Sequence, residues 1–147
     1  MAGNATTAVA RADLRDVDEV LAQAGQLLDF TRPVALMFVA VLRCIPDKDD
    51  PAAIAERYLA ALAPGSCLVL SHSTDEFAPG RTHQASAEAR KRGATWIPRS
   101  KDDILRMFNG RELLDPGLVL VSRWRPDGGV PGHNADRAWA YGGIARI

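Results

Sequence analysis

Few side chains of this sequence combine a type and a spacing that could support chemistry. His72 follows an apolar run, and its ordinary pKa near neutrality suits a general base, but no partner is visible in the sequence, so we favour a loop histidine. The acids Asp47, Asp49 and Asp50 resemble a metal cluster, yet they stand where a loop runs into a helix start and would favour the helix dipole. We therefore predict loop and cap roles for these acids and no metal site.

Two cysteines and one glycine cluster complete the candidates. Cys44 and Cys67 each lie at or beside an apolar run, without the paired spacing of zinc ligands. We expect reduced, buried side chains and leave a disulfide open as the poorer alternative. The glycines at 128–132 follow no suitable strand and precede no helix, so they predict a hairpin loop rather than a cofactor-binding turn.

Length and charge restrict the class of protein. The 147 residues, 47% of them apolar, suit one domain spanning 1–147. The 18 basic and 18 acidic residues cancel, which argues against binding to nucleic acid or to a membrane surface. The longest apolar run, 34–42, is about half of the roughly 20 residues that cross a bilayer, and the first residues lack the features of a signal peptide. We expect a cytoplasmic protein.

The elements that must position these side chains alternate between strand and helix, which is typical of an α/β fold. The run that begins at Val34 and ends at Leu42 has no polar residue, so we expect a central parallel strand with both faces covered. A helix opens at Asp50-Pro51 and stops at Pro64-Gly65. The remaining patterns predict strands at 6–12, 67–71, 118–124 and 139–147, of which the last two are antiparallel. They also predict helices at 17–28 and 82–92, and a further helix after a capping box at Ser100. Asp16 would cap the first of these helices.

Six short blocks carry a resemblance to a known family. They are ADLRD at 12–16, PVALMFVAVL at 33–42 with IPD at 45–47, LAPGS at 62–66 with LVLSH at 68–72, PGLV at 116–119, WRPD at 124–127 and YGG at 141–143. In this order they resemble the actinobacterial S-adenosyl methyltransferase family, whose members are class I enzymes with a Rossmann-like fold. The succession of elements, closed by an antiparallel β-hairpin, is similar to the C-terminal half of that fold.

The resemblance implies S-adenosylmethionine as cofactor, lying across the carboxyl ends of the first strands. Asp13 matches the acid that accepts a hydrogen bond from the adenine amino group, with Leu14 beside it, because a charged acceptor makes a strong bond to an N–H donor. The alternative is that Asp13 caps the following helix, a role we assign to Asp16.

The resemblance also implies an apolar floor beneath the reacting methyl group, where alignment supplies much of the rate and no catalytic acid or base is required. Arg43, beside this floor, would face either substrate or solvent. The matching positions are Val39 and Ala40 on the cofactor side, and Val41, Leu42, Arg43 and His72 as candidates on the substrate side.

The first two strands of such a domain and its glycine-rich turn have no counterpart here, so we expect the chain alone to be weak or inactive. In the family's strand order the absent strands lie between the strands at 6–12 and 34–42, which leaves the second as an exposed edge. We expect the edge from Val34 to Leu42 to bind a partner chain or a second copy, or to be closed by the Val9 strand. The alternative function is a noncatalytic remnant that acts as an oligomerising module.

Overall fold

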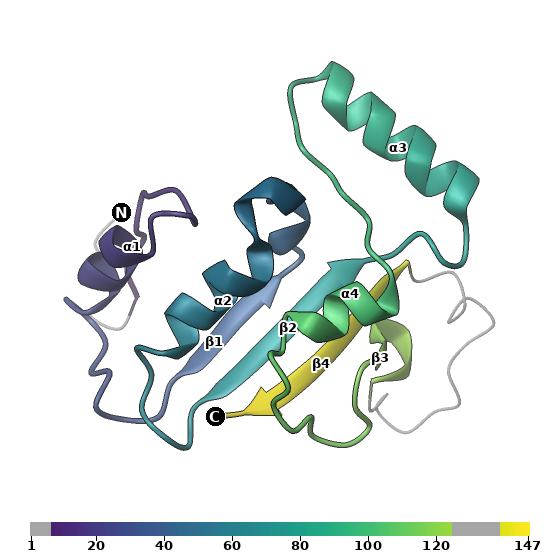
Figure 1. Cartoon of the computed structure of the whole chain (residues 1–147). Helices are drawn as coiled ribbons and strands as arrows, with labels where there is room; N and C mark the ends of the chain where they lie inside the picture. Colours follow the sequence, from purple (N-terminus) through teal and green to yellow (C-terminus); the bar gives the residue numbers. More distant parts are fainter. Residues whose placement is uncertain (1–6, 125–138) are drawn as a thin grey trace.

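The computed structural model describes residues 7–124 and 139–147 and has an α/β architecture (Figure 1). Four strands form one sheet in the order β1-β2-β4-β3. β1 (Ala35–Val39) pairs in parallel with β2 (Cys67–Ser73), and β4 (Ala140–Arg146) is antiparallel to both β2 and β3 (Val119–Leu120). The helices are α1 (Val17–Ala24), α2 (Pro51–Leu59), α3 (Pro79–Lys91) and α4 (Lys101–Arg106). The predicted fold class is confirmed.

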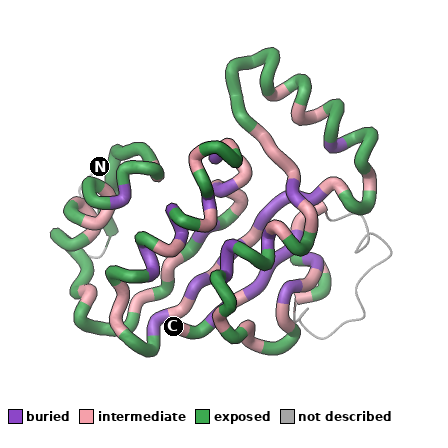
Figure 2. Tube along the Cα trace, viewed as in Figure 1, coloured by how far each residue is buried: buried purple, intermediate pink, exposed green. Residues whose placement is uncertain are grey.

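The core lies between α2, α4 and one face of the sheet. Along β2, the side chains of Leu68, Leu70 and His72 are buried, whereas those between them are only half-buried (Figure 2). Phe38 of β1 meets Tyr58 of α2 edge-on, with 5.6 Å between ring centroids. This alternation places one face of the sheet in the core and leaves the opposite face to other contacts.

Local capping explains where two helices begin. The Asp50 carboxylate accepts a hydrogen bond from the Ala53 amide at 3.0 Å, and Ser100 Oγ accepts one from the Asp103 amide at 3.1 Å. Both starts are as predicted. α1 is shorter than predicted because it ends at Ala24, before the poor helix former Gly25. Asp16 occupies its N-cap position but makes no side-chain capping bond, so that predicted cap is wrong.

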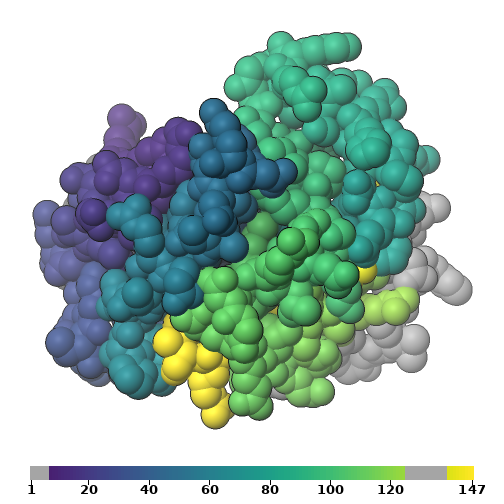
Figure 3. Space-filling model, viewed as in Figure 1, coloured from purple at the N-terminus to yellow at the C-terminus, as the bar shows by residue number. Residues whose placement is uncertain are grey.

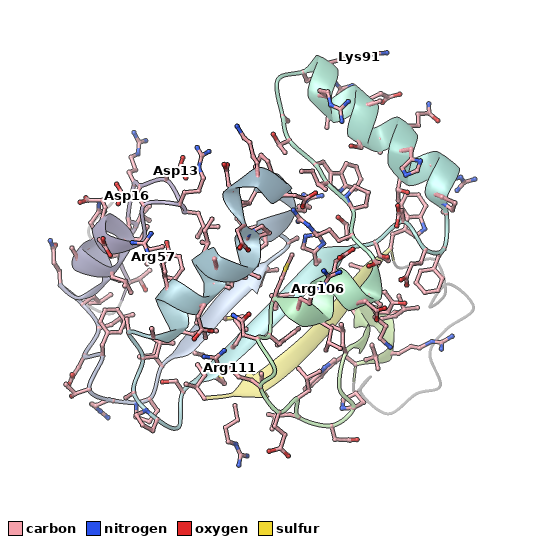
Figure 4. The ribbon with its side chains drawn as sticks, viewed as in Figure 1. Asp13, Asp16, Arg57, Lys91, Arg106 and Arg111 are labelled. Atoms are coloured by element: carbon pink, nitrogen blue, oxygen red, sulfur yellow. The ribbon has the colours of Figure 1, made fainter. Side chains whose placement is uncertain are left out.

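α3 extends away from the sheet, toward Lys91 at its C-terminal end (Figure 4). Among its residues only Thr82 is buried, and none belongs to the hydrophobic core cluster. In the part of the chain that the structure describes, no helix is long and apolar enough to cross a membrane.

The predicted strand at 6–12 is wrong over residues 7–12, which form no strand, and Thr6 lies outside the described residues. Val9 is 89% exposed and pairs with no strand of the sheet, so it does not close the edge of β1. A strand gains its stability from hydrogen bonds and side-chain contacts to a neighbouring strand. β1 is an edge strand, as the resemblance implied.

Other strand predictions also need correction. β1 ends at Val39 rather than at residue 42, and it lies at the edge of the sheet, so the prediction of a central strand is wrong. Its outer side chains Met37 and Val39 are 59% and 61% exposed, so one of its two faces is uncovered. The strand predicted at 118–124 is reduced to Val119–Leu120 because residues 121–123 form a 3-10 turn.

The two cysteines are unpaired, but Cys44 is exposed and Cys67 half-buried, so the prediction of buried side chains is wrong. Neither residue belongs to the core cluster. The loop predicted at 128–132 lies outside the described residues.

Candidate site at the ends of the parallel strands

The carboxyl ends of β1 and β2 lie side by side, with Val39 in register with Ser71. The next residue, Ala40, adopts a left-handed conformation with φ of 52°, which costs an alanine roughly 1 kcal/mol. Its amide donates to the Ser71 carbonyl oxygen at 3.0 Å and lies 3.1 Å from Ser71 Oγ. These contacts fix a sharp turn into a short 3-10 helix at Leu42–Cys44.

The turn gives the four predicted floor residues, 39–42, different degrees of exposure. Val39 is largely exposed at the strand end, and Ala40 and Val41 are half-buried. Leu42 is fully buried in the core and so has no surface to offer to a ligand. The exposed part of this predicted floor is therefore limited to residues 39–41.

Asp13 lies on the loop before α1, where Figure 4 shows it with Asp16 away from the sheet. Its carboxylate accepts hydrogen bonds from Arg15, from the amide at 2.9 Å, Nε at 3.0 Å and Nη2 at 2.6 Å. Arg15 also donates to Asp49 at 3.1 Å. The side-chain bond from Arg15 is the largest cause that lowers the pKa of Asp13 to about 2, so the carboxylate is ionised at neutral pH.

The Arg15 contacts use three of the roughly four lone-pair positions of the Asp13 carboxylate and leave about one for a further donor. The Tyr58 hydroxyl donates to the Leu14 carbonyl at 2.8 Å and attaches this loop to α2. The bonds to Asp13 come from Arg15 rather than from the first amides of α1. Asp13 therefore does not cap that helix.

Arg99 is a buried residue for which the sequence analysis predicted no role. Its guanidinium donates to the Leu42 carbonyl at 3.2 Å, the Ile45 carbonyl at 2.7 Å and the Asp47 carboxylate at 2.7 Å. A planar guanidinium suits several acceptors at once. Arg99 thus holds the loop after β1 in place. Its position, after Pro98 in a segment without a regular apolar pattern, gives no signal of this role.

His72 completes this buried cluster from β2. Its Nε2 lies 2.9 Å from Arg99 Nη1, and its Nδ1 lies 2.8 Å from the Ser73 carbonyl oxygen. Because arginine only donates, Nε2 accepts, and the proton lies on Nδ1 in a neutral ring. Burial is the main cause that lowers the pKa of His72 to about 4, and the Arg99 charge adds to it. The interpretation as a loop histidine is wrong, since His72 is a buried strand residue.

The acids after β1 have separate partners. Asp47 pairs with Arg99, Asp49 with Arg15, and Asp50 caps α2, so the predicted cap role of Asp50 is confirmed. Across residues 7–124 and 139–147, no three acids, histidines or cysteines come together as metal ligands would.

Arg43 contacts the turn after β1 and the ring of Trp96. It is half-buried, its Nε donates to the Ala40 carbonyl at 2.9 Å, and its guanidinium lies 5.1 Å from the centre of the Trp96 ring. Such a cation–π contact is worth roughly 0.5–1 kcal/mol near the surface. Arg43 therefore supports the turn at Ala40.

A cavity of about 490 Å³, lined by both charged and apolar residues, lies between the N-terminal ends of α2 and α4, next to the Arg99 cluster. In Figure 3 this surface lies between the blue atoms of α2 and the green atoms of α4. Its charged lining residues are Asp47, Asp50, Asp75, Arg99, Asp103 and Arg106. Arg106 pairs with Asp103, and Arg99 with Asp47, so much of this charge is neutralised within the chain.

Comparison with known proteins identifies the family. The model of a family described as S-adenosyl methyltransferase matches residues 1–147. The chain belongs to this family. Among curated proteins, no sequence matches it.

Two solved structures share the fold of this family member. A DUF574 family protein from Streptomyces avermitilis MA-4680 is 35% identical, with a TM-score of 0.86 over 92% of this chain and 53% of its own length. A protein of Thermobifida fusca YX, described as a candidate methyltransferase, is 31% identical, with a TM-score of 0.79 over 92% of this chain and 52% of its own. The chain therefore spans about half the length of these structures.

Proposed function

We propose that this chain forms the C-terminal part of an S-adenosylmethionine-dependent methyltransferase domain, which acts when a polypeptide equivalent to the relatives' unmatched half completes it. The observation that carries the proposal is the parallel pair β1 and β2, which ends beside the Ala40 turn in a chain of this family. Ligands of open α/β sheets bind outside the carboxyl ends of parallel strands.

In this proposal Asp13 binds the adenine amino group of the cofactor. Its carboxylate is ionised, its position is set by Arg15, and it retains about one free acceptor position. Leu14 lies beside it and is attached to Tyr58 through its carbonyl oxygen, so the loop is already ordered before a cofactor binds.

The apolar residues at the carboxyl end of β1 and directly after it form the floor of the reaction site. Val39 and Ala40 face the cofactor, and Val41 and Arg43 lie toward the acceptor. S-adenosylmethionine supplies the activated methyl group, and these side chains orient the reactants and exclude water. His72 is a positioning residue. Its Nε2 accepts a hydrogen bond from Arg99, and Arg99 in turn holds the loop at 42–47.

Calorimetric titration with S-adenosylmethionine and S-adenosylhomocysteine tests the proposal. The chain alone should show at most weak binding. A fusion that places the unmatched residues of the Streptomyces avermitilis protein ahead of Met1 should bind both compounds. If the isolated chain binds either compound tightly, or the folded fusion binds neither, the proposed division of the site is wrong.

Asp13→Ala in that fusion should weaken binding by about tenfold or more, the usual effect of losing a hydrogen bond to a charged acceptor. Asp16→Ala is the matched control, because Asp16 is an acid of the same loop without a side-chain cap bond. Equal losses in the two variants would contradict the adenine role of Asp13.

A second candidate function is a noncatalytic, oligomerising module. The observation in its favour is the unpaired edge of β1, where Met37 and Val39 are exposed. Exposed edges of this kind recruit other chains. In that case the chain alone should sediment as a stable oligomer whose mass is independent of cofactor, and the fusion should also fail to bind S-adenosylmethionine.

A further inference from the structure

Arg15 connects the loop that carries Asp13 to the chain segment after β1. Its Nη1 donates to Asp49 Oδ2 at 3.1 Å, and Asp49 ends the 3-10 helix Asp47–Asp49, directly before the residue that caps α2. On its other side the same guanidinium binds Asp13. One positive group therefore lies between the carboxylate of the proposed adenine site and a carboxylate at the start of α2.

The bonds from Arg15 to Asp13 orient the Asp13 carboxylate. Arg15 Nε lies 3.0 Å from Oδ1 and Nη2 lies 2.6 Å from Oδ2, so the guanidinium binds both oxygens, an arrangement that we call the Arg15 fork. The Arg15 amide also donates to Oδ1, at 2.9 Å. Both lone pairs of Oδ1 are therefore in use, whereas Oδ2 accepts one bond from the described residues. The acceptor position that Asp13 retains is thus on Oδ2.

Burial does not hold either side chain in place. The side chains of Asp13 and Arg15 are 50% and 53% exposed, so a carboxylate without the fork would rotate among several staggered conformations. A ligand that has to immobilise such a side chain loses affinity by roughly two- to tenfold. The Arg15 fork removes this cost before a ligand binds. Asp49, whose side chain is only 24% exposed, fixes the guanidinium from the opposite side.

We propose that Arg15 is the positioning residue through which this site selects adenine: it orients the free acceptor position of Asp13 toward the 6-amino group, and Asp49 holds it there. This inference rests on the proposed function, in which Asp13 binds adenine. An ionised carboxylate only accepts hydrogen bonds, so it gains no bond from a purine that lacks the amino group. The selectivity of the site therefore depends on how well this one acceptor is oriented.

The loop has a second attachment that does not involve Arg15. The Tyr58 hydroxyl donates to the Leu14 carbonyl and holds the backbone of the loop against α2. Loss of the Arg15 side chain should therefore leave the loop attached and release only the Asp13 carboxylate. The two roles can be separated by experiment, because a displaced loop would weaken every ligand, whereas a misoriented carboxylate weakens only a ligand with an amino group.

Calorimetric titration of two ligands into the fusion with the Streptomyces avermitilis segment tests the inference. The ligands are S-adenosylhomocysteine and its 6-deamino analogue, which has hydrogen in place of the amino group. The unmodified fusion should bind S-adenosylhomocysteine more tightly than the analogue by about tenfold or more. Arg15→Gln should weaken S-adenosylhomocysteine binding by roughly two- to tenfold and leave the affinity for the analogue unchanged. Because both ligands bind the same protein, a general loss of folded protein cancels in the ratio.

Three further variants separate the fork from charge alone. Arg15→Lys keeps the positive charge but cannot bind both oxygens in a fork, so it should lower selectivity as Arg15→Gln does. Asp49→Ala should lower it by a smaller factor, because the fork to Asp13 remains. Arg57→Gln is the matched control: the Arg57 side chain is also 53% exposed and donates to Asp18 at 3.1 Å, so its loss should leave selectivity unchanged.

Two outcomes would overturn the inference in the fusion. Arg15→Gln that weakens both ligands equally, or leaves both unchanged, would show that Arg15 does not act through the amino group. Arg15→Lys with full selectivity would show that the charge suffices without the fork. Asp13→Ala distinguishes this failure from that of the proposed function, because selectivity that survives Asp13→Ala contradicts the adenine role itself.

NMR of the chain alone measures the fork without a ligand and without the fusion. The Nε proton of Arg15 should exchange with water severalfold more slowly than that of Arg57, because only the first donates to a carboxylate among the described residues. Asp13→Ala should abolish this difference. Equal exchange at Arg15 and Arg57 in the unmodified chain would show that the carboxylate is not held before a ligand binds, and would overturn the inference.

Discussion

Acidification from pH 7 to pH 5 should destabilise this fold through one residue, His72. Its ring is fully buried, accepts a hydrogen bond from Arg99 and is neutral. Protonation would place a second positive charge against the guanidinium and remove the acceptor at Nε2. The pKa is about 4 in the folded chain against an ordinary value of 6.5, so the folded chain binds this proton more weakly than the unfolded chain.

The sign and size follow from this difference. The stability that a neutral His72 provides is complete above pH 6.5, decreases as the pH falls below that value, and stops changing below about 4. Integrated between pH 7 and pH 5, the two pKa values give a loss of about 2 kcal/mol in the free energy of unfolding. The lowered pKa values of Asp13, Glu56 and Asp103 act mainly at lower pH.

Urea unfolding at the two pH values measures this loss, with His72→Gln as the variant that cannot titrate. The glutamine variant is less stable at both pH values but should lose little more between them. His83→Gln is the control, because His83 is an exposed histidine of α3. If the wild-type chain and His72→Gln lose the same free energy on acidification, the neutral buried ring is not the cause.

Two further predictions concern stability and use matched pairs. Arg99→Met should lower the free energy of unfolding by about 3–5 kcal/mol, because it removes the donors to the Ile45 carbonyl and to His72 Nε2. Arg106→Met at the surface should change it by less than about 0.5 kcal/mol. Asp50→Ala should cost about 1 kcal/mol through the lost cap of α2, and Asp16→Ala should have no measurable effect, both followed by thermal unfolding.

Those parts of the fold that depend only on residues close together in the chain could be predicted from the sequence. Asp50 and Ser100 cap helices through amides three residues ahead, so their short motifs contain the whole interaction. Strands at 67–71 and 139–147 could also be predicted, close to the observed bounds of β2 and β4. Even so, the length of β1 could not be predicted, because apolar character does not show that Ala40 takes a left-handed turn.

The candidate site was harder to predict because its contacts join distant residues. Arg99 and His72 are 27 positions apart, and Arg99 and Leu42 are 57 apart. A lone histidine after an apolar run is typical of a strand exit, and nothing in its neighbours indicates that β2 continues through it. Once β2 extends to Ser73, alternation buries His72, and a buried ring nitrogen requires a donor.

Val9 shows the same dependence on distant residues at the level of the sheet. Its segment has the composition of a strand, and the resemblance places it next to strands that have no counterpart among residues 7–124 and 139–147. Without a neighbour it forms no strand, while β1, which pairs with β2 on one side, does. The unpaired edge of β1 has the same cause. Under the proposed function, a strand added along this edge would give the Val9 segment a neighbour to pair with and would complete the site beside Ala40.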